Sequence, residues 1–139
     1  MTRQDTNADE PTVMEIELGL RATASGVFAL EAAVDLLISH RRWLTRADFR
    51  DLIEVEVPGK WQRLAWVDWD RLDPEAFPAS SSETTVLKVA ASLATGAPVC
   101  LGEVVGGLDE HTVTAIAAAV LHANGNRDAA IRLVWPGGS

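Results

Sequence analysis

Residues 80–125 constrain the fold of this chain more than any other part, because they encode two helices with clear start and stop signals. Ser80 and Glu83 have the spacing of a capping box, in which the hydroxyl and the carboxylate each bind a free backbone N–H at the start of a helix. Apolar side chains then cover most of the helix circumference, as they do in helices that lie in a protein core. Gly96 ends the run, because glycine readily adopts the left-handed conformation of a helix C-cap. We therefore predict a buried helix at residues 82–95.

A second helix follows in the same segment, with Asp109 as its N-cap and the Asn-Gly pair at 124–125 as its stop signal. Apolar residues recur at the period of one buried helix face, and the predicted face is Val113, Ile116, Ala117, Val120 and Leu121. We predict a helix at residues 109–123. The apolar connector before it holds Cys100 and has the length of a short buried strand. Because no Lys, Arg or His adjoins Cys100 to activate it, we expect a buried and unreactive thiol.

This half of the chain also resembles a group of known sequences. The run SSSETTVLKVAASLATGAPVCLGEVVGGLDEHTVTAIAAAVLHANG resembles small uncharacterised proteins of high-GC Gram-positive bacteria, with a weaker likeness in LEAAVDLLISHRRWLTRADF and LAWVDW. Ten Arg against two Lys, with abundant Ala, suit a GC-rich coding bias. The resemblance implies a bacterial protein and brings no activity, cofactor or functional residue with it.

The rest of the chain predicts shorter elements around these helices. Residues 1–12 are polar and predict a flexible tail, and residues 13–139 are long enough for a single globular domain. The hydrophobic period predicts two further helices, at residues 26–39 and 46–52. Alternating apolar residues predict short strands at residues 13–18, 53–57, 63–67 and 131–135. The turn-like residues between 57 and 63 predict that the two middle strands form a hairpin. The sequence therefore predicts an α+β fold, with about four helices packed on a small, mostly antiparallel sheet.

Composition and charge narrow the class of protein. With 47% hydrophobic residues the chain suits a globular protein, and no apolar run reaches the roughly 18 residues that span a membrane. The polar N-terminal residues lack the apolar region of a signal peptide, so we expect a cytoplasmic protein. A net charge of −8 argues against nucleic acid or an anionic membrane as a partner.

The charge is nevertheless uneven along the chain. Residues 41–63 carry six Arg or Lys against four Asp or Glu, a local balance of +2 that leaves −10 elsewhere. The helix end, short helix and hairpin predicted in this segment would mimic part of a winged helix-turn-helix. A nucleic-acid-binding regulator that uses the Arg-rich residues 41–63 is therefore an alternative function, although the interleaved acids weaken it.

Two pairs of carboxylates could carry chemistry. Glu31 and Asp35 share the polar face of the helix at 26–39 and would supply half of a metal or acid–base site, but spacing implies no His or carboxylate partner. Asp68 and Asp70 spell a DxD motif, which holds a divalent metal in some sugar-transferring enzymes. A metal-dependent enzyme that uses Asp68 and Asp70 is a weaker alternative. We expect an ordinary solvated helix face for the first pair and the end of a strand for the second.

The histidines supply no metal site in this prediction. His111 and His122 are expected opposite the buried face of the second helix, and their eleven-residue separation corresponds to about 16 Å along a helix axis. One metal ion cannot bind both, because His–metal bonds are about 2 Å long. We therefore expect no metal, no cofactor and, more readily than an enzyme, a binding protein.

The chain has five Trp and no Tyr, and four of the Trp lie between residues 43 and 69. Large aromatic side chains concentrate in cores and in interfaces alike, so the cluster is either a wall of the core or a partner surface. With two nearby cations it supplies the candidate ligand- or partner-binding residues, which are Trp43, Trp61, Trp66, Trp69, Arg42 and Arg46. The function we favour is a non-catalytic cytoplasmic binding or regulatory module that acts through protein contacts, with a homodimer as one possible form.

Overall fold

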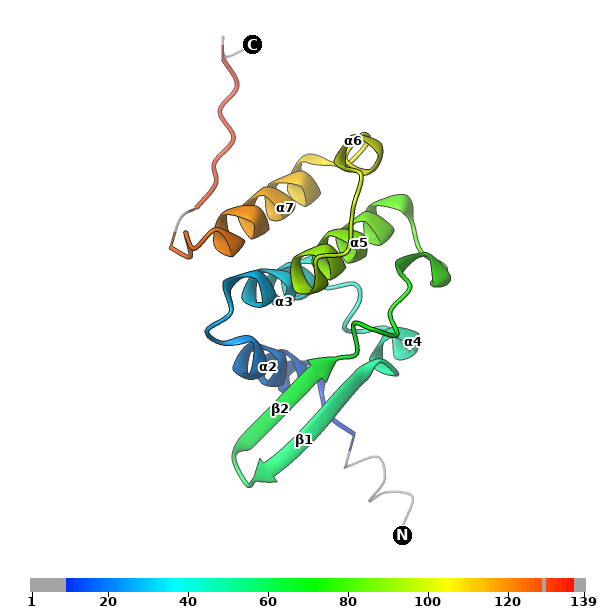
Figure 1. Cartoon of the computed structure of the whole chain (residues 1–139), viewed down its shortest axis with the longest axis vertical. Helices are drawn as coiled ribbons and strands as arrows, with labels where there is room; N and C mark the ends of the chain where they lie inside the picture. Colours follow the sequence, from blue (N-terminus) through cyan, green and yellow to red (C-terminus); the bar gives the residue numbers. More distant parts are fainter. Residues whose placement is uncertain (1–9, 129, 137–139) are drawn as a thin grey trace.

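The fold of this protein is α+β, as the sequence predicts (Figure 1). The computed structural model describes residues 10–128 and 130–136. Their elements, in chain order, are α2 (Val13–Ala24), α3 (Phe28–His40), α4 (Ala47–Arg50), β1 (Ile53–Gly59), β2 (Gln62–Val67), the 3-10 turn η1 (Pro74–Ala76), α5 (Ser81–Thr95), α6 (Leu101–Val104) and α7 (Glu110–Ala123). None of these helices is both long enough and apolar enough to cross a membrane.

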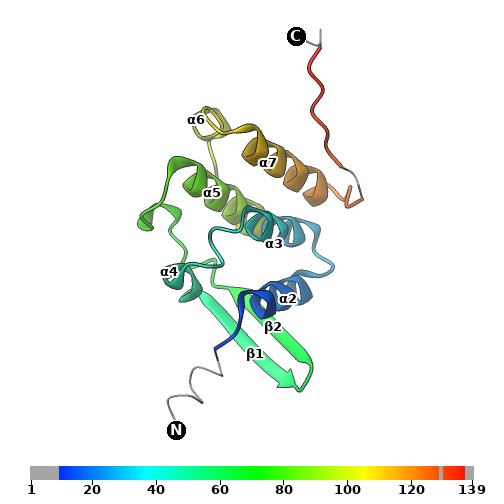
Figure 2. The same cartoon turned by 180° about the vertical axis from the view of Figure 1, so that it is seen from behind.

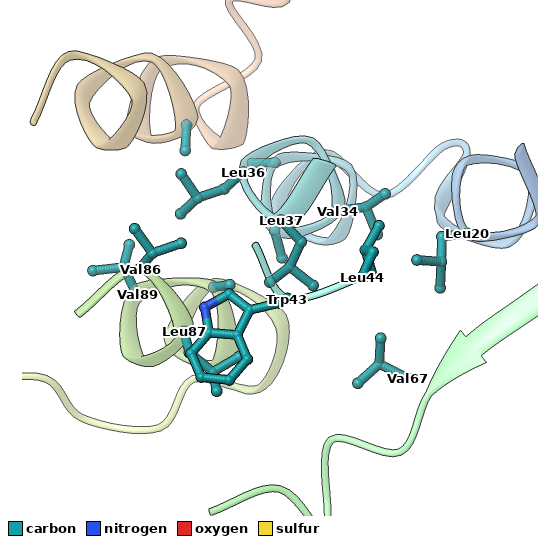
Figure 3. Packing of buried hydrophobic residues seen from close by; sticks show 14 of the residues in the cluster. Leu20, Val34, Leu36, Leu37, Trp43, Leu44, Val67, Val86, Leu87 and Val89 are labelled. Atoms are coloured by element: carbon teal, nitrogen blue, oxygen red, sulfur yellow. The ribbon is translucent and has the colours of Figure 1, made fainter. Parts of the chain in front are cut away.

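The elements form successive layers from the hairpin to α7 (Figures 1 and 2). Helix α2 lies on β2, α3 packs against α2 on one side, and α5 and α7 pack against α3 on the other. The hairpin and α7 therefore lie at opposite ends of the molecule (Figure 1). Side chains from α2, α3, α5 and β2 converge between these layers, around Trp43 and Leu37 (Figure 3).

The prediction of a strand at residues 13–18 is wrong, because these residues form the first half of α2. Thr12 and Glu15 make a capping box at its start: the Glu15 N–H donates to Thr12 Oγ1 (3.1 Å), and the Thr12 N–H donates to Glu15 Oε1 (3.0 Å). The fully buried apolar side chains of α2 are four residues apart, at Ile16, Leu20 and Ala24. The alternation that suggested a strand depends on Met14 and Leu18, whose side chains are exposed. Residues 1–9 of the predicted tail lie outside the described residues.

Helix α2 crosses β2 at close range through Gly19. A Cβ atom at Gly19 would lie 2.8 Å from the backbone nitrogen of Ala65, closer than such atoms approach in real proteins. One turn later, the Thr23 hydroxyl donates a hydrogen bond to the Ala65 carbonyl (2.6 Å). Backbone-to-backbone packing therefore joins α2 to β2, and the missing side chain of Gly19 makes it possible.

The hairpin predicted at residues 53–57 and 63–67 is present as β1 and β2, which pair antiparallel with Ile53 opposite Val67 and Val55 opposite Ala65. These two strands make the sheet in the described part of the chain. The prediction of a strand at residues 131–135 is wrong, because no strand is assigned at residues 130–136. A hydrophobic alternation alone makes no strand when a partner strand is lacking.

Helices α5 and α7 confirm the predictions at 82–95 and 109–123. Ser80 and Glu83 form the predicted capping box, and Gly96 takes the left-handed conformation with φ of 82°. The predicted buried strand between the helices is absent; the chain there is irregular until α6, and Cys100 is exposed rather than buried. Pro98 and Leu101 of the apolar connector are also exposed.

The predicted buried face of α7 is confirmed at Ile116, but it is wrong at Val113 and Val120. The buried residues of α7 are Thr112, Ile116 and Ala119, whereas Val113 and Val120 are exposed. Helix α7 packs on α3 with Ile116 and Ala119 in the core and with His122 in contact with α3. Packing against α3 and α5, rather than side-chain size, therefore sets the phase, since Ile116 is buried although it is larger than Val113 and Val120.

Candidate functional site

The four candidate tryptophans lie in different environments. Trp43 is completely buried in the core, where its indole Nε1–H donates to the Glu83 carbonyl (3.0 Å), so this ring is out of reach of any partner. Trp69 is partly buried against the same core. Trp61 and Trp66 lie on the hairpin and are 88% and 38% exposed. The sequence cluster therefore divides into a core half and a surface half.

The two candidate arginines differ in the same way. Arg42 is exposed, whereas Arg46 holds Asp48 with two hydrogen bonds, from Nε (2.9 Å) and from a terminal nitrogen (2.6 Å). The hydrogen bonds from Arg46 lower the pKa of Asp48 below its ordinary value. The Arg46 guanidinium also lies 4.9 Å from the centre of the Trp43 ring and donates to the Pro78 carbonyl (2.9 Å). Arg46 is thus held within the fold rather than presented to a partner.

Other cations of the Arg-rich segment also have internal partners. Arg50 donates to the Pro11 carbonyl (3.1 Å), which fixes the chain before α2. Arg63 Nε donates to Glu15 (2.8 Å), which joins the hairpin to α2. The hydrogen bond from the Thr12 N–H and then the one from Arg63 lower the pKa of Glu15. These contacts tie the segment to the N-terminal helix.

The solvent side of the hairpin carries a small surface with an aromatic and acidic character. We call it the hairpin face, and its residues are Glu54, Glu56, Leu64 and Trp66. Trp66 lies opposite Glu54 in the register, and Leu64 lies opposite Glu56. At the turn of the hairpin, Trp61 is the most exposed of the large apolar side chains in the described residues. Apolar rings next to carboxylates suit a partner that presents both cations and apolar groups.

The outer edge of β1 has backbone groups that point away from the hairpin. The Asp68 N–H donates to the Leu52 carbonyl (2.7 Å), and this bond fixes the phase of the ladder between the strands. Because hydrogen-bonded pairs alternate with non-bonded pairs, the even-numbered residues of β1 bond to β2 and the odd-numbered ones turn outward. Ile53 and Val55 therefore direct their N–H and C=O groups to the edge. No hydrogen bond to those groups is present in the part of the chain that the structure describes.

The two edges of the hairpin differ in whether their outward backbone groups have hydrogen-bond partners. On the β2 side, the Thr23 hydroxyl binds the outward carbonyl of Ala65. On the β1 side lies a groove of about 430 Å³, with Pro11, Ile16, Arg50, Ile53 and Val55 among its walls. The edge of β1 is therefore an open strand edge above a partly apolar groove.

A second site joins α3 to α7 and contains a histidine that the sequence did not place there. His122 Nε2 lies 2.8 Å from Glu31 Oε1, and His122 Nδ1 lies 3.0 Å from Asp35 Oδ2. Arg21 of α2 pairs with Asp35, and Arg127 Nε lies 3.2 Å from Glu31. We call these five residues the acid–histidine cluster. It borders a cavity of about 180 Å³.

We expected Glu31 and Asp35 to lie on an ordinary solvated helix face. The structure instead pairs both carboxylates with His122 and with arginines. The signal for His122 was its position three residues after Ala119, which places it on the true buried face of α7. The sequence prediction placed His122 opposite the buried face of α7 because that face was assigned around Val113 and Val120, which are exposed.

The acid–histidine cluster suits a structural role. His122 of α7 contacts both Glu31 and Asp35 of α3, so the cluster joins the two helices. The hydrogen bond from His122 and the one from the Gly26 N–H lower the pKa of Glu31 below its ordinary value. Within residues 10–128 and 130–136, His, Cys, Asp and Glu form no group of three or more that could hold a metal ion.

The DxD motif lies in a turn after β2 and not on a strand. Asp68 joins the end of the ladder through its backbone, and its carboxylate lies 3.7 Å from Arg71. Asp70 is exposed in the turn, and Trp69 between them is partly buried against the core. The motif thus coincides with the end of the hairpin.

Comparison with protein-family models, with curated proteins and with solved structures finds no match for this chain. The resemblance of the second half to small uncharacterised proteins of high-GC Gram-positive bacteria therefore stays a prediction.

Proposed function

We propose that the protein is a non-catalytic cytoplasmic module of bacterial origin that binds a protein partner through the hairpin. The observation that carries the proposal is the exposure of Trp61 and Trp66 on neighbouring parts of one hairpin. Tryptophan buries a large area when a partner covers it, and it is over-represented among the residues that dominate binding energy. Trp43 shows by contrast how this chain buries a ring that serves its core.

The partner that fits this surface is a protein segment with Arg or Lys among apolar residues. Glu54 and Glu56 stand beside Trp66 and Leu64 on the hairpin face. A cation of the partner would be attracted both to a carboxylate and to the face of an indole ring. The net charge of −8 would also steer a cationic partner toward the molecule and repel an anionic one.

The experiment is selection from a displayed random peptide library on the immobilised protein. We expect enrichment of peptides that combine Arg or Lys with apolar residues, and weaker binding of these peptides at higher salt. A variant with Trp61→Ala and Trp66→Ala should lose them, while a control with Leu101→Ala and Val120→Ala, two other exposed apolar positions, should keep them.

Two results would contradict the proposal. One is that the selected peptides bind the Trp61→Ala, Trp66→Ala variant as well as they bind the parent. The other is that the selected peptides are acidic, because carboxylates on the peptide would face Glu54 and Glu56. Thermal unfolding of each variant verifies that the fold is intact before binding is compared.

A further inference from the structure

We propose that the free edge of β1 binds residues 131–135 of a second copy of this chain as an added strand. The inference goes beyond the proposed function, because the occupant is the protein itself and the backbone of the β1 edge makes the contact, with Glu54 and Glu56 of the hairpin face as charge partners.

The edge offers backbone groups in the order that an incoming strand needs. Ile53 and Val55 turn their N–H and C=O groups outward, since the ladder to β2 uses the even-numbered residues of β1. An extended segment beside β1 would bond to these groups and convert the two-stranded hairpin into a three-stranded sheet. Exposed strand edges bind extended peptides in this way.

The groove beside the edge accepts apolar side chains from one side of such a segment. The side chains of Ile53 and Val55 line the groove with Ile16 and Pro11. Residues that lie opposite Ile53 and Val55 in an added strand would point to this same side of the sheet. The occupant must therefore be apolar at every second position.

The C-terminal segment has this pattern. Ile131, Leu133 and Trp135 alternate with Arg132 and Val134, so one side of an extended chain would carry the three larger apolar groups. Residues 130–136 belong to no helix or strand, and Leu133, Val134 and Trp135 are exposed. Apolar side chains at this density on the surface call for a partner.

Opposite charges would pair on the solvent-facing side of the added strand. In the register that places the apolar residues over the groove, Arg132 would lie opposite Glu54 or Glu56 on the solvent side. Opposite charges directly across a strand pair stabilise it, and like charges destabilise it. Arg132 is the one cation between residues 129 and 139, so its position in this segment is specific.

The geometry of the molecule makes the contact intermolecular. The C-terminal segment leaves from the α7 end, and the hairpin lies at the other end of the long axis (Figures 1 and 2). Two copies that exchange their C-terminal segments would form a closed dimer with two identical contacts, whereas one-sided addition would give chains of molecules.

The test is a charge exchange measured by sedimentation velocity over a range of protein concentrations. The parent should show concentration-dependent association. Arg132→Glu should remove it, because the segment would then place Glu against Glu54 and Glu56. The paired change Glu54→Lys and Glu56→Lys should remove it as well, because Arg132 would meet two Lys. All of these positions are exposed, so the monomer should fold normally, as thermal unfolding will verify.

Mixing the two variants gives the decisive observation. In the mixture, each C-terminal segment again finds an edge of opposite charge on the other variant, so a one-to-one complex should form although neither variant associates alone. Their net charges of −10 and −4 have the same sign, so attraction between whole molecules cannot produce that complex.

Three results would overturn the proposal: a parent that stays monomeric at every concentration, association that Arg132→Glu leaves unchanged, or a mixture that does not recover the complex. The variant with Trp61→Ala and Trp66→Ala should still self-associate. Failure of the proposed function and failure of this inference are therefore distinguished by different variants.

Discussion

At the scale of single residues, Gly19 decides how closely α2 approaches the hairpin. Alanine is normally the better helix residue, by about 1 kcal/mol. At Gly19, however, the added Cβ would lie 2.8 Å from the Ala65 nitrogen and 2.9 Å from its Cβ, and backbone on both sides leaves little room to adjust. We expect Gly19→Ala to lower the free energy of unfolding by about 1–3 kcal/mol, the usual cost of overpacking, as measured by urea denaturation.

The matched control for this substitution is Gly102→Ala in α6. A Cβ at Gly102 would meet no atom within 4 Å. Helix propensity should then act alone, and the variant should be as stable as the parent or slightly more so. Equal effects at Gly19 and Gly102 would contradict the close approach of α2 to β2.

Also at the residue scale, Glu31 gives the fold a defined pH dependence. Its pKa in the folded state is lowered by the hydrogen bonds from His122 and the Gly26 N–H, relative to an ordinary value of 4.5. A lowered carboxylate pKa stabilises the fold above the unfolded pKa, and that contribution is lost as the pH falls through the folded pKa. We expect Glu31→Gln to reduce the melting temperature near neutral pH, and the difference from the parent to shrink as the pH falls below 4.5.

The control for the pH experiment is Glu103→Gln, at an exposed position on α6. Its melting temperatures should follow those of the parent over the whole range. If the difference between parent and Glu31→Gln is the same at every pH, the substitution acts through packing, and the paired carboxylate makes no pH-dependent contribution.

At the scale of elements, α5 illustrates how local signals fix a helix but not the depth of its residues. Both Leu87 and Leu93 belong to the helix that the sequence predicts to be buried. The structure places Leu87 at 0% exposure in the core and Leu93 only partly buried at its margin. The cost of a truncated side chain should therefore differ between these two positions of the same helix.

We expect Leu87→Ala to lower the free energy of unfolding by about 2–5 kcal/mol, because a buried Leu loses its transfer energy and leaves a cavity. Leu93→Ala should cost clearly less. Chemical denaturation of both variants measures the difference. A larger effect at Leu93 would place the centre of the core nearer to the C-terminal end of α5 than the structure has it.

At the scale of the whole molecule, the pairing of its cations argues against binding of nucleic acid. The Arg-rich segment at residues 41–63 carries the local balance of +2, but Arg46 and Arg63 are paired with Asp48 and Glu15. The remaining chain is strongly acidic. Phosphate contacts need cations that are available to release counterions from nucleic acid.

We therefore expect no micromolar binding of random duplex DNA or single-stranded RNA at low salt, measured by fluorescence anisotropy. A variant with Arg42→Ala and Lys60→Ala serves as the control, since both side chains are exposed. Micromolar binding that is lost in this variant and at higher salt would instead support the nucleic-acid-binding alternative.

The sequence by itself determined the elements whose signals are short-range. The capping box of Ser80 and Glu83, the glycine at position 96 and the alternation in the hairpin each act within a few residues, so α5, β1 and β2 could be predicted. The start of α2 also has a local signal, the capping box of Thr12 and Glu15. The alternation of apolar residues at 13–18 predicts a strand there instead, and that prediction is wrong.

Only the tertiary structure decided which faces and which tryptophans are buried. The phase of α7 depends on its packing against α3 and α5, and the contact of His122 with Glu31 joins residues 91 positions apart. Likewise Trp43 is buried and donates a hydrogen bond to α5, while Trp66 is partly exposed. Burial is a property of what packs against a residue, and the partner surface is set by elements that are distant in sequence.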